Sequence, residues 1–217
     1  MTFKLKLLGH ASFKATIGDK IIYIDPYGGE DSDYKEKADM ILISHKHGDH
    51  SSKGKVNLMR TEKTKLITSS DNAENFEGKV IKLDPGQDQE FDDIKIYGVY
   101  GYNTHRFRNP GEPFHTKDIQ TAFIIEYKGK RVYFAGDTDF IEEMKKLEKI
   151  DVAMLPIDGK YTMDPEEALK AVEAIKPKTV IPMHWRENKP EDFKKAVEKK
   201  FPKIEVKIIL PGQEQEI

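Results

Sequence analysis

The sequence predicts an α/β fold in which a mixed β-sheet is covered by helices. Two observations carry this prediction. The N-terminal half contains many short apolar or alternating runs of strand length, and the C-terminal part alternates strand-like with helix-like segments. The chain of 217 residues contains no repeat and no flexible linker. This length suits one domain or two tightly joined halves, and we assign residues 1–217 to a single domain.

Short strands dominate the first part of the chain. The run at residues 40–44 is apolar up to Ser44, which indicates a strand buried on both faces. Lys128-Gly129 separates two strand-like runs and predicts a hairpin turn. A loop rich in Gly, Pro and Asn extends from Gly101 to Asp118. The predicted strands are 3–8, 12–17, 21–25, 40–44, 65–69, 79–83, 94–100, 121–127 and 130–135.

Helices enter only after the hairpin. We expect helices at 139–149, 165–175 and 190–200, and strands at 151–155, 178–183 and 204–210. The second helix has a clear beginning, because Asp164 can cap it, Pro165 suits its first position and Glu167 completes a capping box.

Composition excludes several classes of protein. The 36 basic and 38 acidic residues give a formal charge of −2, which argues against a nucleic-acid binder or a polybasic membrane anchor. Disulfides and thiolate metal ligands are excluded because there are no cysteines. The N-terminus lacks the apolar region of a signal peptide and no apolar run is long enough to span a membrane, so we expect a cytoplasmic protein.

The most informative segment is ILISHKHGDHSS, residues 41–52. It places His45, His47, Asp49 and His50 within six residues, directly after the apolar run at 40–44. Ligand-binding loops of open sheets begin at such strand ends. Two histidines at i and i+2 can chelate one ion, and the following Asp-His pair can reach a second ion about 3.5–4 Å away. A solvated turn that contains histidines by accident would not account for clustering this tight.

Two further candidates also follow apolar runs. Asp137 stands in YFAGDTD and His184 in VIPMHW. Taken alone, Asp137 could belong to a turn and His184 could be a core histidine with its hydrogen bonds satisfied. Beside the histidine cluster, the more economical interpretation is that both are metal ligands.

These motifs, in this order, resemble the metallo-β-lactamase superfamily over nearly the whole chain. The matching segments are LGHASF, YIDPYGG, SHKHGDH, FHTK, FAGDTD, PIDGKYTMDPEEA and PMHW. Together they look like the compact branch described as metal-dependent hydrolases, which includes the lactonase acting on L-ascorbate 6-phosphate. The resemblance implies a four-layer αββα sandwich.

The resemblance also implies a dinuclear metal site. His45, His47 and a later histidine would hold one ion, while Asp49, His50 and His184 would hold the other. Asp137 would bridge the two ions, and Asp25 would fix the histidine loop through hydrogen bonds. We assign catalytic roles to Asp49 and Asp137. Zinc is the favoured metal, and manganese or iron would suit the same imidazole and carboxylate ligands.

The third histidine of the first ion is either His105 or His115. His105 follows the strand-like run IKIYGVYGY, where many members of the superfamily place this ligand, but Arg106 and Arg108 beside it disfavour a bound cation. His115 lies in EPFHTK, which resembles the ligand segment of this branch, and neighbouring prolines stiffen the loop. We therefore assign the ligand to His115.

Three residues are candidates for substrate contacts. His10 in LGHASF could face the pocket or bond to backbone. Arg106 could bind a phosphate or carboxylate through its planar fork, or be a solvated loop arginine. Tyr161 precedes the second helix and could line the rim of the site, although a plain loop residue needs no function.

The predicted activity is hydrolysis of a small molecule, namely a phosphoester, phosphodiester or lactone. Two cations sharing a water lower its pKa toward neutrality and supply a hydroxide nucleophile, and Asp49 can accept the proton. The alternative on the same fold is a non-haem iron protein that handles oxygen or sulfur. The sequence is compatible with a homo-oligomer and does not specify one.

Overall fold

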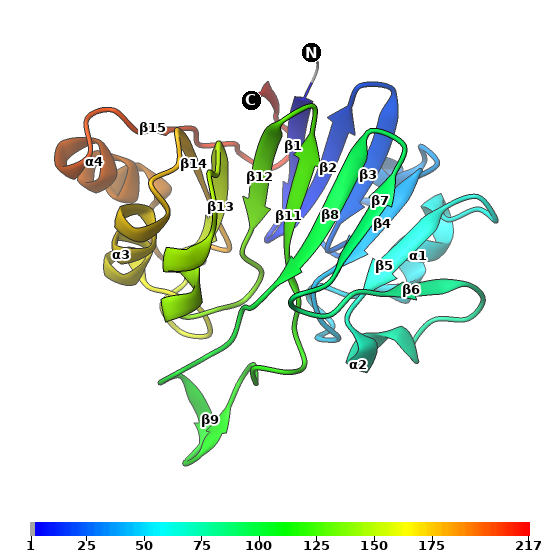
Figure 1. The fold of residues 1–217 in the computed structure, drawn as a ribbon, viewed down its shortest axis with the longest axis horizontal. Coiled ribbons are helices and arrows are strands. Elements are labelled where there is room, and N and C mark those ends of the chain that lie inside the picture. Colours follow the sequence, from blue (N-terminus) through cyan, green and yellow to red (C-terminus); the bar gives the residue numbers. More distant parts are fainter. Residues whose placement is uncertain (1–2) are drawn as a thin grey trace. The chain divides into compact units, whose positions relative to one another are not determined.

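Two seven-stranded mixed sheets form the framework of residues 3–217, the part of the chain that the computed structural model describes (Figure 1). Each sheet belongs to one of two compact units. The first unit consists of the residues up to Asp84 together with Ile209–Ile217, and the second of Pro85–Ile208. Each unit contains helices as well as its sheet, so the predicted α/β class is confirmed.

The first sheet changes from antiparallel to parallel at β3. Strands β1, β2 and β3 form an antiparallel meander, and β3 to β6 run parallel to one another. Parallel neighbours need crossover connections, and the segments between them contain the 3-10 turn η1 (Asp31–Tyr34) and the helices α1 (Lys53–Met59) and α2 (Ser70–Ala73). The order is β16-β1-β2-β3-β4-β5-β6, with β1 at Phe3–Gly9, β2 at Ser12–Ile17, β3 at Lys20–Ile24, β4 at Met40–Ile43, β5 at Lys65–Thr68, β6 at Val80–Lys82 and β16 at Glu214–Glu216.

The core of the first unit fixes the strand that precedes the histidine motif. All four residues of β4 are buried, as the apolar run predicts. Helix α1 (Lys53–Met59) places Val56 and Met59 in one buried cluster with Ile41 and Ile43 of β4. Burying such a side chain contributes about 1.5–3 kcal/mol, so β4 is a rigid support for the loop that follows it. Helix α2 (Ser70–Ala73) and the 3-10 turn η1 (Asp31–Tyr34) complete the helical segments of this unit.

The second sheet has the corresponding arrangement. Strands β7, β8, β11 and β12 pair antiparallel, and β12 to β15 run parallel. Its order is β15-β14-β13-β12-β11-β8-β7, with β7 at Asp88–Phe91, β8 at Ile94–Val99, β11 at Ala122–Tyr127, β12 at Lys130–Phe134, β13 at Val152–Pro156, β14 at Thr179–Met183 and β15 at Glu205–Val206. The loop at 101–118 contains a small ribbon of β9 (Phe107–Asn109) and β10 (Glu112–Pro113).

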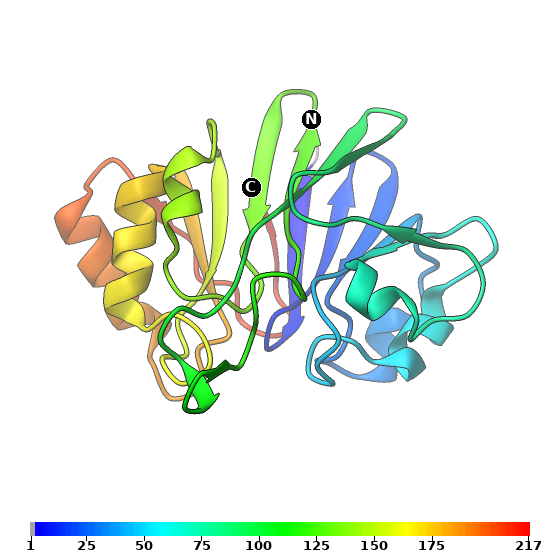
Figure 2. The same ribbon diagram turned by 60° about the horizontal axis from the view of Figure 1, so that its bottom comes forward.

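Two helices pack side by side against the parallel strands of the second unit. Helix α3 (Pro165–Ile175) contacts β13, and α4 (Pro190–Lys200) contacts β14 and β15 (Figures 1 and 2). Both helices have the predicted bounds. The capping box of α3 is confirmed, because the Asp164 carboxylate accepts a hydrogen bond from the Glu167 N–H at 2.9 Å.

Several predicted elements were wrong in extent or missed. The expected helix at 139–149 is only a 3-10 turn, η2 (Glu142–Lys146), because Ile141 at its N-cap offers no capping side chain. The expected strand at 204–210 is confined to β15, because the chain passes into the first unit at Ile209. The short elements η1, α1, α2, β7, β9, β10 and β16 were not predicted. Within residues 3–217, no helix has the length and apolarity needed to cross a membrane.

Candidate metal centre

Most of the predicted ligands follow the carboxyl ends of parallel strands. In the first unit, Asp25 follows β3 and His45 closely follows the neighbouring β4. In the second unit, Asp137 comes after β12 and His184 comes directly after β14. Since the carboxyl ends of parallel neighbours meet at one edge of a sheet, each unit gathers its own set of ligand side chains there.

In the first unit, a hydrogen-bonded chain fixes the ring of His45. The Ser44 hydroxyl donates to Asp25 Oδ2 at 2.6 Å, so its oxygen accepts from Nδ1 of His45 at 2.9 Å. The Ser44 N–H donates to Asp25 Oδ1 at 2.7 Å. With Nδ1 protonated in this way, Nε2 is the nitrogen of His45 that can bind a metal.

His50 is held by the same aspartate. Its Nδ1 lies 2.7 Å from Asp25 Oδ2, and both side chains are fully buried. The ring centroids of His45 and His50 are 4.3 Å apart, and those of His45 and His47 are 4.7 Å apart. Asp25 therefore connects Ser44 and His50 through its two carboxylate oxygens.

Asp49 and His10 form the more accessible part of the first unit's cluster. The Asp49 side chain is 45% exposed, and its Oδ2 lies 3.3 Å from Nε2 of His10. His10 also makes an edge contact with the His50 ring, with centroids 5.5 Å apart. His10 is thus placed against two predicted ligands rather than bonded only to backbone.

In the second unit, Asn103 fixes the ring of buried His115. Asn103 Oδ1 accepts from Nδ1 of His115 at 2.8 Å, which again leaves Nε2 as the nitrogen that could bind a metal. That Nε2 lies 3.5 Å from Asp137 Oδ2.

His184 approaches the same carboxylate oxygen from another strand. Its Nε2 lies 3.4 Å from Asp137 Oδ2, and its Nδ1 lies 3.5 Å from Asp158 Oδ2. Asp137 Oδ2 is therefore shared by the Nε2 atoms of two histidines. Ligands about 2.0–2.1 Å from one tetrahedral ion are about 3.4 Å from each other, so both N···O separations fit pairs of metal ligands.

The chemistry of these atoms also fits a bound cation. An imidazole whose proton is on Nδ1 presents a lone pair at Nε2, and a carboxylate oxygen is an acceptor as well. Two acceptors facing each other repel unless a cation lies between them. The residues of the second unit thus suit a divalent ion.

Three predicted site residues have strained backbone. The φ angles of His10, Asp25 and His184 are 57°, 45° and 47°, in the left-handed region that residues other than glycine rarely adopt. Such conformations persist where the surroundings hold them, and they concentrate at functional sites.

The structure gives Arg106 and His105 contacts that the sequence did not predict. The guanidinium of Arg106 is 9% exposed and contacts the carboxylates of Asp139 at 2.6 Å, Asp164 at 3.3 Å and Glu167. Burial acts to lower the pKa of Arg106, but the hydrogen bonds to Asp139 and Glu167 raise it above its ordinary value. The His105 ring is 56% exposed and lies against Asp139 and Glu167, not against Asp137.

Tyr161 makes its hydrogen bonds to site residues through its backbone. Its N–H donates to Asp158 Oδ2 at 3.3 Å, and its carbonyl accepts from Asn103 Nδ2 at 2.9 Å. Its ring packs edge-on against Phe114, with centroids 4.9 Å apart. Tyr161 therefore joins the two loops that carry the partners of His115 and His184.

Apart from Asp25, sequence reasoning missed the residues that hold the candidate ligands in place. The buried Gln120 clamps the backbone of Asp137, donating to its carbonyl at 2.6 Å and accepting from its N–H at 3.2 Å. No sequence pattern marks Gln120 or Asn103 as a site residue, because each is an ordinary polar residue in or beside a loop. A pattern does mark Asp158, since it follows the apolar run of β13 as Asp137 follows that of β12.

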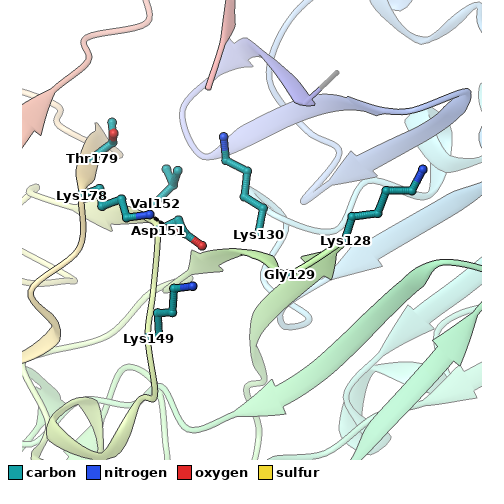
Figure 3. A pocket seen from close by; sticks show the side chains of 8 residues that line it. All are labelled: Lys128, Gly129, Lys130, Lys149, Asp151, Val152, Lys178 and Thr179. Carbon is teal, nitrogen blue, oxygen red and sulfur yellow. Dashed lines mark ion pairs between the residues drawn. The ribbon is translucent and has the colours of Figure 1, made fainter. Parts of the chain in front are cut away.

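A pocket in this unit lies at the opposite ends of the same strands. It has a volume of about 340 Å³, and its lining includes Lys128, Lys130, Lys149, Lys178 and Asp151 (Figure 3). These residues lie near the amino ends of β12, β13 and β14, and none of them is a predicted ligand. The pocket is therefore separate from the candidate metal centre.

Comparison with known proteins identifies relatives of this chain. The profile of the beta-lactamase superfamily domain matches residues 4–184. A UPF0173 metal-dependent hydrolase of Pelotomaculum thermopropionicum is 35% identical over 231 aligned residues, covering 99% of this chain and 100% of that protein.

Solved structures give the same result. The structure of a protein described as a metal-dependent hydrolase from Parabacteroides distasonis has 32% identity and a TM-score of 0.88, covering 97% of this chain and 94% of that one. The metallo hydrolase Igni18 of Ignicoccus hospitalis has 29% identity and a TM-score of 0.84, covering 100% and 99%. The predicted superfamily and fold type are confirmed. The chain belongs to the beta-lactamase superfamily and, within it, to the UPF0173 family of metal-dependent hydrolases.

Proposed function

We propose that this chain is a hydrolase that uses a dinuclear metal centre, with zinc as the favoured metal, to attack a small phosphoester, phosphodiester or lactone. The family membership supports hydrolysis, and the resemblance in the motifs supports two ions. One ion would be held by His45, His47 and His115, the other by Asp49, His50 and His184, and Asp137 would bridge them.

The observation that carries this proposal is the position of Asp137 Oδ2. It lies 3.5 Å from Nε2 of His115 and 3.4 Å from Nε2 of His184, as expected for a carboxylate shared by two ions with one histidine on each. A carboxylate that merely accepted a hydrogen bond from one histidine would not need the second at the same distance.

When bound, the ions would lower the pKa of a water molecule and stabilise negative charge that develops on the substrate. Residues of the chain would accept the proton and keep the histidine rings in place. The Asp49 carboxylate is accessible to water and is oriented by His10 Nε2 at 3.3 Å, so it can accept the proton of the attacking water. Ser44 holds the ring of His45, and Asp25 that of His50, in the tautomer with the proton on Nδ1.

The three proposed substrate classes share one requirement. In each, water attacks an electron-poor phosphorus or carbonyl carbon, and negative charge grows on neighbouring oxygens. A cationic centre lined by carboxylate and imidazole suits this charge change. The centre needs no serine or cysteine nucleophile, and the chain has no cysteine.

The test compares His115→Ala with His105→Ala. Each variant is assayed for metal content and for turnover of a panel of phosphoesters, phosphodiesters and lactones. We expect His115→Ala to lose metal and turnover, because its Nε2 faces Asp137, and His105→Ala to retain both, because its ring lies elsewhere and is largely exposed. Loss in His105→Ala alone would overturn the ligand assignment. A coloured iron protein without hydrolytic activity would overturn the proposed function.

A further inference from the structure

Asn103 is joined to His115 by three hydrogen bonds across a separation of twelve residues. Its Oδ1 accepts from the backbone N–H of His115 at 2.9 Å and from Nδ1 of the ring at 2.8 Å. Its own N–H donates to the carbonyl of His115 at 2.9 Å. Both the chain and the ring of His115 are thus fixed by one residue at the base of the loop at 101–118.

The amide of Asn103 can adopt only one orientation. Its Nδ2 donates to Asp139 Oδ1 and to the carbonyl of Tyr161, each at 2.9 Å. A flipped amide would place its oxygen against these two acceptors and its NH₂ group against two donors of His115. Asn103 therefore holds the His115 proton on Nδ1 and keeps Nε2 as the metal-binding nitrogen.

Asp139 is itself held by Arg106. Asp139 Oδ2 accepts from the N–H groups of Thr104 and His105 at 2.7 and 3.1 Å, and Oδ1 lies 2.6 Å from a guanidinium nitrogen of Arg106. Together with the hydrogen bond from Asn103 Nδ2, these contacts fix both carboxylate oxygens of Asp139.

Arg106 links this carboxylate to helix α3. The same guanidinium contacts Glu167 in the first turn of α3 and Asp164 at its N-cap, and Nε donates to the carbonyl of Gly159 at 3.2 Å. A planar group with several donors can satisfy all these oxygens at once, which a lysine could not. A continuous polar chain therefore runs from α3 through Arg106, Asp139 and Asn103 to His115.

We propose that Asn103 and Arg106 are positioning residues for the metal ligand His115, with Asn103 acting directly and Arg106 acting through Asp139. This inference rests on the proposed function, in which His115 binds a metal ion. Arg106 is then not a substrate contact, because three carboxylates and a carbonyl already engage its guanidinium.

The loop offers a matched control for each residue. Asn109 and Arg108 are exposed in the same loop, Asn109 bonded to Glu112 and Arg108 over the ring of Phe114. The variants are Asn103→Leu against Asn109→Leu, and Arg106→Met against Arg108→Met. Each pair makes the same chemical change, and only the first member touches the polar chain.

Cobalt(II) is titrated into chelator-stripped protein in competition with a chromophoric chelator, and the visible spectrum of bound cobalt is recorded. We expect Asn103→Leu to weaken cobalt binding about 10–100-fold and to alter the spectrum, since partners of ligating histidines have effects of this size. Arg106→Met should change both in the same direction by less. The two controls should stay within about twofold of the wild type.

The outcomes separate cleanly. Wild-type protein that binds no cobalt would overturn the proposed function itself. Wild-type protein that binds cobalt, beside folded Asn103→Leu and Arg106→Met variants with unchanged affinity and spectrum, would overturn only this inference. If Asn103→Leu does not fold, as judged by circular dichroism of the metal-free form, Asn103→Ser replaces it, because serine is small and cannot reach both groups of His115. Unchanged cobalt binding by Asn103→Ser would then contradict the inference.

Discussion

At the scale of single residues, four histidines of the candidate centre have an oxygen beside Nδ1, for different local reasons. The oxygen comes from a hydroxyl, an amide or a carboxylate. The pairs are His45 with Ser44, His50 with Asp25, His115 with Asn103, and His184 with Asp158. An oxygen at Nδ1 favours the tautomer with the proton on Nδ1, which leaves Nε2 as the nitrogen that could bind a metal.

Asp25 tests this account within the first unit. Asp25→Asn should weaken metal binding about 10–100-fold, because an amide cannot accept from Ser44 and from His50 with both of its side-chain atoms. The measurement is a zinc titration against a competing chelator. Asp31→Asn is the control, since Asp31 is exposed and its substitution removes the same charge. Equal affinities for the two variants would mean that Asp25 does not organise the site.

The candidate ligands are recognisable in the sequence, whereas most of the residues that hold them in place are not. His45, His47, Asp49 and His50 form a dense motif directly after an apolar run, a pattern typical of a metal-binding loop at the end of a strand. Asn103 lies in a loop rich in polar residues, and its importance depends on the return of the chain twelve residues later. Arg106 shows the opposite case, because its type indicates anion binding whereas its fold buries it among carboxylates of its own chain.

At the scale of elements, local signals predicted the bounds best where they did not depend on distant contacts. Helix α3 carries its own cap and first-turn proline, and its bounds are correct. The segment at 139–149 has helical periodicity, but Asp139 bonds to the loop at 101–118 and Ile141 is at the N-cap, so only η2 forms. Strand β16 is three residues of Glu and Gln, which pair with β1 without any apolar pattern.

In α3, substitution by glycine should change the stability in opposite directions at the C-cap and inside the helix. Lys176, the C-cap residue, has a φ of 52°, which costs a residue with a Cβ about 1 kcal/mol. Lys176→Gly should therefore raise the free energy of unfolding by about 0.5–1 kcal/mol. Lys170→Gly, at an exposed position inside the helix, should lower it by about 1 kcal/mol. Urea unfolding of both variants measures this, and a loss of stability in both would contradict the assigned C-cap.

At the scale of the whole molecule, a buried charged carboxylate makes the stability depend on pH. Asp151 is buried at the lysine-lined pocket, with Oδ1 2.8 Å from Lys178 Nζ and Oδ2 accepting from the Arg131 N–H at 2.9 Å (Figure 3). Burial acts to raise the pKa of Asp151, but Lys178, the Arg131 N–H and Lys149 lower it below its ordinary value.

The sign of the pH effect follows from this direction. A carboxyl whose pKa is lower in the folded state stabilises the fold at neutral pH, and that contribution is lost as the pH falls below about 4 and through the folded pKa. Asp151→Asn should therefore reduce stability at neutral pH and flatten its decline in acid. Urea unfolding across this range measures both, with the exposed Asp19→Asn as the control. An acid decline as steep as that of the wild type would rule out this role for Asp151.

The central claim is that this chain holds metal ions through the histidines and aspartates of its sheet edges, and its metal content tests that claim most directly. Wild-type protein is purified without added metal and its ions are counted by elemental analysis. We expect about two divalent ions per chain, as two-metal hydrolases contain, with zinc the most abundant. Removing them with a chelator should lower the melting temperature, because the ions bind only the folded state. A content well below one ion per chain, with a melting temperature that chelation leaves unchanged, would contradict the claim.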